Sequence, residues 1–166
     1  MQVNGWELFA HALLLDQLAK LIAAVEKERS KKPKTYQSSA NFKVLAALRQ
    51  LIFVTIPADP TRSEYRQGGT LGADRKHWFR AKFGGQRFRL FFRYDSKSKV
   101  IIYAWVNDSD NLRTYGSKND AYAVFRKMLD RGTPPDDWNA LLKAAKEPAT
   151  STRLETAKPA SERSET

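Results

Sequence analysis

The chain has 166 residues and a net charge of +11, because 29 lysines and arginines outnumber 18 aspartates and glutamates. This length suits one domain with a real core, and a hydrophobic content of 42% excludes a chain that is disordered throughout. The lack of cysteine excludes disulfides and thiolate zinc sites. Because there is neither a signal-peptide pattern nor a long apolar run, we expect a soluble, cytoplasmic protein without membrane contact.

The first half of the chain predicts one extended segment followed by two helices. Residues 3–10 resemble a short strand, and apolar residues with helical spacing predict a helix over residues 12–31. A second helix is expected over residues 39–55, with Pro57 ending it. Residues 57–74 are rich in proline and glycine and predict a loop, whose length is more often functional than accidental.

Three strands are predicted next, in residues 76–83, 87–94 and 100–106. Gly84–Gly85 is a two-residue hairpin signal between the first two strands. The third strand is apolar on both faces, so we expect it to be central or covered on both sides. Its register stays open, because it depends on the length of the polar turn DSKSK that precedes it.

Helices are expected again toward the C-terminus. Asn119 or Asp120 can cap a helix that ends at Gly132, and Pro134–Pro135 with Asp136 begins a short last helix. Residues 147–166 hold one large apolar residue and predict a disordered tail after a domain of residues 1–146. The fold class is therefore α+β, with a mainly antiparallel central sheet, two N-terminal helices and C-terminal helices.

The segment RFRLFFRY, residues 87–94, has one face of unusual charge. Side chains alternate along a strand, so one face is apolar and the other, here called the basic face, carries Arg87, Arg89, Phe91 and Arg93. A two-residue turn at Gly84–Gly85 places Lys82 opposite Arg87, and Arg80 opposite Arg89. Like charges directly opposite one another destabilise a sheet. This four-cation cluster therefore predicts an anionic ligand, and arginine suits phosphate.

Nucleic acid is the ligand that the wider charge pattern favours. Residues 62–99 hold eleven basic and three acidic side chains, so much of the excess charge lies in one window. On the basic face Trp78 lies opposite Phe91, and the two rings could stack RNA bases or, equally, pack under a helix. A five-residue turn before the third strand would add Tyr103 and Trp105 to this face, and a four-residue turn would bury them.

The residue types present favour RNA cleavage without a metal ion or cofactor. The two histidines, His11 and His77, fit no metal spacing, and the acidic run at residues 107–110 reads as a turn or cap. RNA supplies its own nucleophile, the 2′-hydroxyl, so an enzyme must orient it, remove its proton and stabilise the phosphorane. Arginines can stabilise the charge, and Lys82 among them can act as the base because neighbouring cations favour the neutral amine.

Four segments carry a family resemblance: VNGWELFAH, RFRLFFRY, NLRTYGSKNDAYAVFRKML and RGTPPDDW. Over roughly residues 3–145 the chain resembles the YhaV toxins of the RelE superfamily, which belong to type II toxin–antitoxin systems. The resemblance implies a RelE-like microbial ribonuclease fold and a ribosome-associated, metal-independent endoribonuclease that cleaves mRNA and inhibits translation. It also implies a PrlF-type antitoxin that neutralises the toxin, and a toxin–antitoxin complex that binds operator DNA and represses the shared operon.

The resemblance also implies catalytic residues. Two basic residues before the hairpin turn correspond to Arg80 and Lys82, and the arginine of the following strand corresponds to Arg89. The first of these is arginine where RelE relatives have lysine, so proton transfer would fall to Lys82. The set is completed by an arginine after the last strand, which corresponds to Arg113, and by a C-terminal tyrosine. This tyrosine corresponds to Tyr122 or to Tyr115.

Further RNA-binding residues follow from the basic face rather than from the family: Arg87, Arg93, Trp78 and Phe91, with Tyr115 as the other candidate tyrosine. The same face would also serve a nucleic-acid-binding regulator without catalysis, which is the alternative function. A basic scaffold domain that binds an acidic protein is a third interpretation. Only the endoribonuclease would cleave RNA. The regulator would bind RNA and leave it intact, and the scaffold domain would neither cleave nor retain it.

Overall fold

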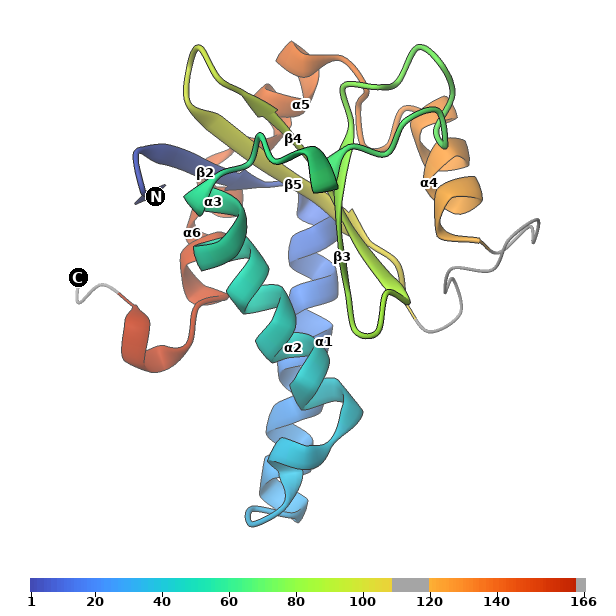
Figure 1. Ribbon diagram of the computed structural model, residues 1–166. Helices are drawn as coiled ribbons and strands as arrows, with labels where there is room; N and C mark the ends of the chain where they lie inside the picture. The colour runs from blue at the N-terminus through green and yellow to red at the C-terminus, as the bar shows by residue number, and fades with distance from the viewer. Residues whose placement is uncertain (109–119, 164–166) are drawn as a thin grey trace.

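A computed structural model gives the fold, and it describes residues 1–108 and 120–163. Its centre is a five-stranded sheet with the strand order β1-β2-β5-β4-β3 (Figure 1). Strands β2 and β5 are parallel, and the other neighbouring pairs are antiparallel. The sheet is therefore mixed but mainly antiparallel, as predicted, and its strands are β1 (Gln2–Val3), β2 (Trp6–Ala10), β3 (Phe79–Phe83), β4 (Phe88–Asp95) and β5 (Val100–Val106).

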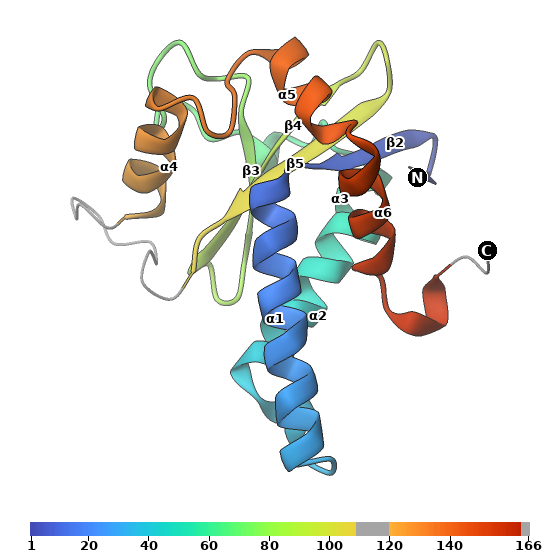
Figure 2. The same ribbon diagram turned by 180° about the vertical axis from the view of Figure 1, so that it is seen from behind.

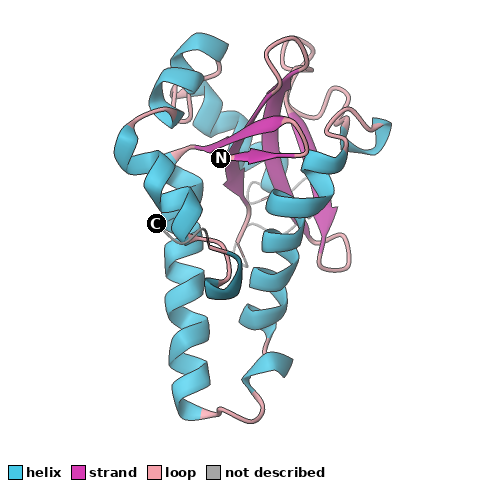
Figure 3. Cartoon of the chain, turned by 90° about the vertical axis from the view of Figure 1, so that its left-hand side faces the viewer, coloured by secondary structure: helices cyan, strands magenta, loops and turns pink. Residues whose placement is uncertain are grey.

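Helices cover both faces of this sheet, which confirms the α+β class (Figure 2). On one face lie α1 (Ala12–Lys31) and a long helical stretch made of α2 (Ala40–Gln50), a π-helical segment (Leu51–Thr55) and α3 (Ile56–Ala58). The other helices come from the C-terminal part: α4 (Ala121–Asp130), α5 (Trp138–Ala145) and α6 (Pro148–Thr156). Figure 3 shows α1 and α2 side by side as a helical hairpin that projects beyond the sheet.

The ends of these helices follow from the sequence. His11, Ser39, Asp120 and Asp137 each accept a hydrogen bond from a backbone amide in the first turn of the helix that they precede. Such caps satisfy amides that have no partner within the helix. Of the two caps expected for α4, the structure has Asp120. The helical stretch that Pro57 was expected to end continues through it to Ala58, where it stops.

The stretch from Ala40 to Ala58 is long and apolar enough to cross a membrane by length and composition alone, which the sequence reading missed. In the structure it packs on the sheet instead, and Leu45, Leu48 and Ile52 are each at most 2% exposed. About 33% of this stretch is buried inside the structure.

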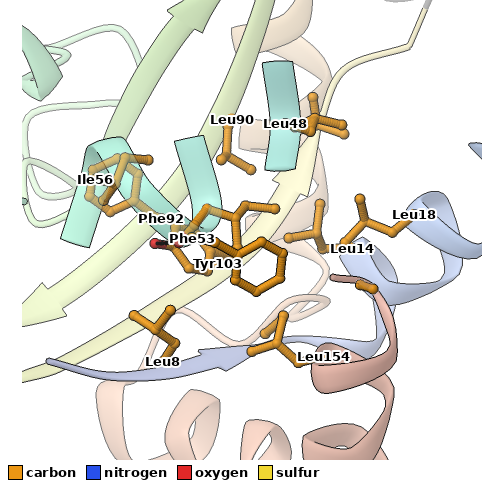
Figure 4. Packing of buried hydrophobic residues seen from close by; sticks show 14 of the residues in the cluster. Leu8, Leu14, Leu18, Leu48, Phe53, Ile56, Leu90, Phe92, Tyr103 and Leu154 are labelled. Carbon is orange, nitrogen blue, oxygen red and sulfur yellow. Dashed lines mark hydrogen bonds between the residues drawn. The ribbon is translucent and has the colours of Figure 1, made fainter. Parts of the chain in front are cut away.

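Two hydrophobic clusters lie on opposite faces of the sheet. The larger cluster joins α1, α2, α3 and α6 to the sheet, and Figure 4 shows Tyr103 and Phe92 at its centre with Leu14, Leu48 and Leu154 nearby. The smaller cluster lies between the sheet and helices α4 and α5, and it includes Trp78, Phe91 and Phe125. The apolar face of the RFRLFFRY strand thus builds the larger core, as its alternation predicts.

The register of the β3–β4 hairpin differs from the prediction by two residues. Lys82 pairs with Arg89, Arg80 pairs with Phe91, and the turn comprises the four residues from Gly84 to Arg87. Gln86 adopts a positive φ of 63° after the two glycines, which lengthens the turn. The observed register has one pair of opposed cations where the predicted one had two, and it stacks Phe83 on Phe88 with ring centroids 5.3 Å apart.

The third long strand resolves an alternative that the sequence left open. Asp95 pairs with Val100, so the turn has four residues, and Tyr103 and Trp105 are both buried. A β-bulge shifts the register of β4 against β5 between Phe91 and Phe92. Because a bulge adds a residue to one strand, Tyr103 packs in the larger cluster and Trp105 in the smaller one.

Within residues 147–166, which composition predicted as a disordered tail, residues 148–156 form a helix. Helix α6 packs against the core, and Leu154 is 1% exposed within the larger cluster. Arg153 forms an ion pair with Asp16 of α1 at 2.6 Å, and Arg49 of α2 donates to the Ala157 carbonyl at 2.9 Å. One buried leucine and these polar contacts attach the segment to the domain. The composition of the whole segment does not reveal them, because most of its other residues are polar or small.

Candidate functional site

Three cations of the basic face meet where β3 and β4 approach their turn. Lys82 and Arg89 are directly paired across the two strands, and Arg80 lies two residues before Lys82 on the same face. Lys82 is exposed, whereas Arg89 is only 5% exposed. The sheet therefore presents one accessible ammonium group beside a guanidinium that its surroundings hold in place.

Tyr122, the second residue of α4, joins the two arginines. Its hydroxyl accepts one hydrogen bond from Arg80 Nε at 2.8 Å and another from Arg89 Nε at 3.2 Å. The Arg89 guanidinium also lies 5.8 Å from the centre of the Tyr122 ring. A phenol hydroxyl can act both as an acceptor and as a donor of hydrogen bonds. The structure thus brings together four of the five predicted catalytic residues: Arg80, Lys82, Arg89 and Tyr122.

The backbone around Arg89 is fixed by the residue that follows β5. Asn107, 1% exposed, accepts from the Arg89 amide at 2.6 Å and donates to the Arg87 carbonyl at 3.0 Å. The Arg89 guanidinium in turn donates to the Gln86 carbonyl within the hairpin turn. Strand β5, the turn and Arg89 are therefore linked by hydrogen bonds, which preorganises the guanidinium.

The position of α4 places Tyr122 over the sheet. Asp120 accepts from the Tyr122 amide at 3.1 Å and thereby fixes the first turn of the helix. Below the helix, Phe125 stacks on Phe91 of β4 with ring centroids 4.3 Å apart, and Trp78 meets Phe125 edge-to-face at 5.0 Å. This aromatic packing anchors α4 so that its N-terminal end lies at the cation cluster.

The same packing covers the rest of the basic face. Trp78 and Phe91 are fully buried, so they pack under a helix and do not form an open stacking surface for bases. Arg93 lies between the rings of Trp78 and Trp138, at 5.4 and 5.3 Å from their centres, and donates to the Asp136 carbonyl. Burial lowers the pKa of Arg93, although its acidic neighbours oppose this. Stacking of RNA bases on Trp78 and Phe91 is therefore incompatible with their burial, whereas Arg93 is half-buried and its predicted RNA contact stays a prediction.

The remaining predicted residues have different outcomes. Arg87 is exposed in the hairpin turn, next to the cation cluster but not opposite Lys82. Arg113 and Tyr115 lie outside the described residues. Tyr122 lies at the cation cluster, and the choice between Tyr122 and Tyr115 as the functional tyrosine stays a prediction.

A second polar cluster ties the start of β3 to α5. His77 Nε2 lies 2.8 Å from Asp136 Oδ1, and Trp78 Nε1 donates to the same oxygen at 2.6 Å. Burial raises the pKa of the Asp136 carboxyl, but the hydrogen bonds from His77 and Trp78 and the nearby Arg75 charge outweigh it, so the net shift is downward. The carboxylate is a structural link between these segments, and His77 has a partner that its sequence spacing did not reveal.

Among residues 1–108 and 120–163, no group of three or more histidine, aspartate or glutamate side chains could hold a metal ion. Of the acidic run at residues 107–110, Asn107 binds the backbone of Arg87 and Arg89, residues 109–110 lie outside the described residues, and the expected turn or cap stays a prediction. The cluster of Arg80, Lys82 and Arg89 can bind phosphate and stabilise developing negative charge. The amine of Lys82 and the hydroxyl of Tyr122 are groups that can exchange protons.

Two positioning residues escaped the sequence reading. Asn107 was considered only within an acidic run, and Gln86 was not singled out at all. Nothing in the sequence marks Gln86, because a positive φ is uncommon for a residue other than glycine. No sequence signal links Asn107 to Arg89, because their contact depends on how β5 lies beside β4.

Comparison with known proteins gives one consistent result. Residues 8–146 match a family model described as a toxin with endonuclease activity, of a toxin–antitoxin system. The chain is 47% identical over 147 residues to the ribonuclease toxin YhaV of Escherichia coli K12, which covers 88% of this chain and 96% of the relative. The toxin YhaV of Escherichia coli O157:H7 matches to the same extent, and no solved structure matches the chain.

Proposed function

The chain belongs to the YhaV family of toxin–antitoxin toxins with endonuclease activity, and from that premise we propose how its own residues cleave RNA. The observation that carries the proposal is the Tyr122 hydroxyl, which holds Arg80 and Arg89 together beside the accessible amine of Lys82. Such a cluster of fixed cations stabilises a pentacovalent phosphate without reorganisation during the reaction.

The proposed reaction is a transesterification. Lys82 takes the proton of a 2′-hydroxyl, whose oxygen attacks the adjacent phosphorus, and the bond from phosphorus to the 5′-oxygen breaks. Arg80 and Arg89 neutralise the charge of the phosphorane. Tyr122 donates its hydroxyl proton to the departing 5′-oxygen, so the products are a 2′,3′-cyclic phosphate and a 5′-hydroxyl end. Lys82 and Tyr122 return to their starting states by exchanging protons with water.

The wider biological role is proposed along with the chemistry. We propose that residues 1–146 adopt a RelE-like toxin fold, that the substrate is mRNA, and that cleavage inhibits translation in association with the ribosome in the cytoplasm. The reaction would need no metal ion, since the cations of the site carry the charge stabilisation. Family membership supports an antitoxin partner, and we propose a PrlF-type antitoxin whose complex with the toxin binds operator DNA.

The chemistry is tested with purified protein and end-labelled mRNA, with and without ribosomes and with excess EDTA. We expect cleavage that EDTA does not abolish, with cyclic phosphate ends. Lys82→Arg keeps the charge but loses a usable base, so cleavage should fall about 10²- to 10⁴-fold while RNA binding stays near that of the unmodified protein. Retention and release of intact RNA by the unmodified protein would instead support the non-catalytic regulator.

Toxicity in cells tests the site independently of the assay conditions. Expression without antitoxin should arrest growth, and Arg89→Ala should relieve the arrest, because it removes the guanidinium that Tyr122 and Gln86 hold in place. Undiminished growth arrest by a stably expressed Arg89→Ala protein would show that the site lies elsewhere.

A further inference from the structure

A groove of about 660 Å³ follows the outer edge of β3 and ends at the candidate catalytic residues. One side of it is formed by strand residues and the hairpin turn, among them Arg80, Lys82 and Gln86. The other side is formed by the loop and short 3-10 helix over residues 62–66. A cavity of this size falls in the range of sites for small ligands.

The charge of the groove favours an anion with several negative groups. Four cationic side chains line it, and the only carboxylate among its lining residues is Glu64: Arg62, Arg66, Arg80 and Lys82 are the cations. Arg62 lies 3.4 Å from Glu64, but both side chains are more than half exposed, so this pair is weak. Arg66 is exposed and forms no ion pair within the part of the chain that the structure describes. Two arginines outside the catalytic cluster are thus available.

The floor of the groove is shaped by the π-helical segment. Leu51 and Thr55, the first and last residues of that segment, both line the groove. The Ile52 carbonyl accepts a hydrogen bond from the buried Tyr103 hydroxyl at 2.7 Å, which fixes the wide turn against the sheet. A π-helical turn within a helix often marks a functional site. Here it contributes one apolar and one hydroxyl side chain, Leu51 and Thr55, to the lining of the groove, and such a surface suits a sugar.

The groove fits an RNA strand better than an added peptide strand. Residue Arg66 already pairs with Phe79 in a β-bridge, and Arg80 donates to the Glu64 carbonyl at 2.8 Å. The segment around Glu64 therefore covers the first part of the β3 edge and leaves only residues 81–83. Three residues are at the lower limit for strand pairing, whereas the surrounding cations can each meet a phosphate.

We propose that this groove binds the sugar-phosphate backbone of the nucleotides next to the scissile bond, with Arg62 and Arg66 as RNA-binding residues. The proposal rests on RNA being the substrate of the neighbouring site. It extends the substrate contact beyond the catalytic cluster and around the edge of β3, and it makes long RNA a better ligand than a fragment that fills the cluster alone.

The test compares an Arg62→Gln/Arg66→Gln variant with a matched variant, Arg131→Gln/Arg163→Gln, which removes two charges from exposed arginines outside both sites. The probes are fluorescent, 2′-O-methylated oligonucleotides of about 12 and about 3 nucleotides, which cannot be cleaved and cover the usual range of site sizes. Affinity is measured by anisotropy over a series of salt concentrations. Thermal melting of both variants establishes that they are folded.

For the longer probe, the slope of log affinity against log salt should be shallower by about 1.4 in Arg62→Gln/Arg66→Gln. Each phosphate contact to a single strand releases about 0.7 of a counterion, and the variant loses two such contacts. The advantage of the longer over the shorter probe should shrink about tenfold or more. The matched variant should keep both the slope and the length preference of the unmodified protein.

Equal slopes in the two variants would overturn the proposal and leave RNA cleavage by Lys82 and Arg89 untouched. A variant that binds RNA normally but is no longer inhibited by its antitoxin would overturn it too, in favour of a protein ligand in the groove. Normal binding with no cleavage by the unmodified protein would refute the proposed chemistry, while the salt slopes would still decide whether the groove binds RNA.

Discussion

Removing one oxygen tests the arrangement of the candidate site most directly. Tyr122→Phe deletes the hydroxyl that accepts from Arg80 and Arg89 but keeps the ring, which packs edge-to-face on Phe91 at 5.6 Å. Arg80 can turn toward water, whereas the Arg89 donor is buried and is left without this acceptor. A hydrogen bond to a charged group contributes about 1.5–3 kcal/mol, so we expect a loss of about 1–3 kcal/mol in the free energy of unfolding. The melting temperature should fall by about 2–10 °C.

The matched control is Tyr65→Phe. Tyr65 is also buried, but its hydroxyl has no hydrogen-bond partner among the described residues, so its removal should leave stability unchanged or slightly increase it. Urea unfolding followed by circular dichroism gives both values, and cleavage of labelled RNA gives the activity. Because Tyr122→Phe frees two charge-stabilising groups, cleavage should drop about 10²- to 10³-fold. Equal stability of the two variants, together with cleavage by Tyr122→Phe at the rate of the unmodified protein, would refute the role assigned to the Tyr122 hydroxyl.

Three further predictions concern the fold that supports this site. Gly84→Ala should destabilise the protein by about 1–3 kcal/mol in urea unfolding, and more than Gly85→Ala: both positions have positive φ, but only at Gly84 would the new Cβ lie 2.7 Å from Phe88. Because folding lowers the pKa of Asp136, its ionised carboxylate stabilises the fold at neutral pH. This stabilisation is lost as the pH falls through the pKa of the folded protein, which lies below 3.8. The urea midpoint should therefore fall less steeply between pH 6 and pH 3 for Asp136→Asn than for the unmodified protein; parallel curves would contradict this. Leu154→Ala should cost about 2–5 kcal/mol if α6 is part of the core, and a change near zero would restore the prediction of a disordered tail.

The cation cluster was predictable because strand alternation is a local rule. Arg80, Lys82 and Arg89 share a face whether the turn has two residues or four, since a shift of two residues conserves the faces. The partner of each residue was not predictable, because Gln86 adds to the turn a positive φ that its residue type does not demand. The resemblance to RelE toxins supplied the tyrosine, and the structure places Tyr122 against both arginines.

The sequence by itself determined which residues alternate, where α1 begins and ends, that the cap of α4 is Asn119 or Asp120, and that the positive charge gathers around one hairpin. These properties depend on neighbours a few positions apart. Only the tertiary structure decided which part of the basic face stays open. Helices α4 and α5, which come from a distant part of the chain, bury Trp78 and Phe91, whose aromatic rings need apolar cover. Trp138 of α5 also packs on the half-buried Arg93. What remains accessible is the end near the turn, where Lys82 lies beside Arg89 and the groove along β3 begins.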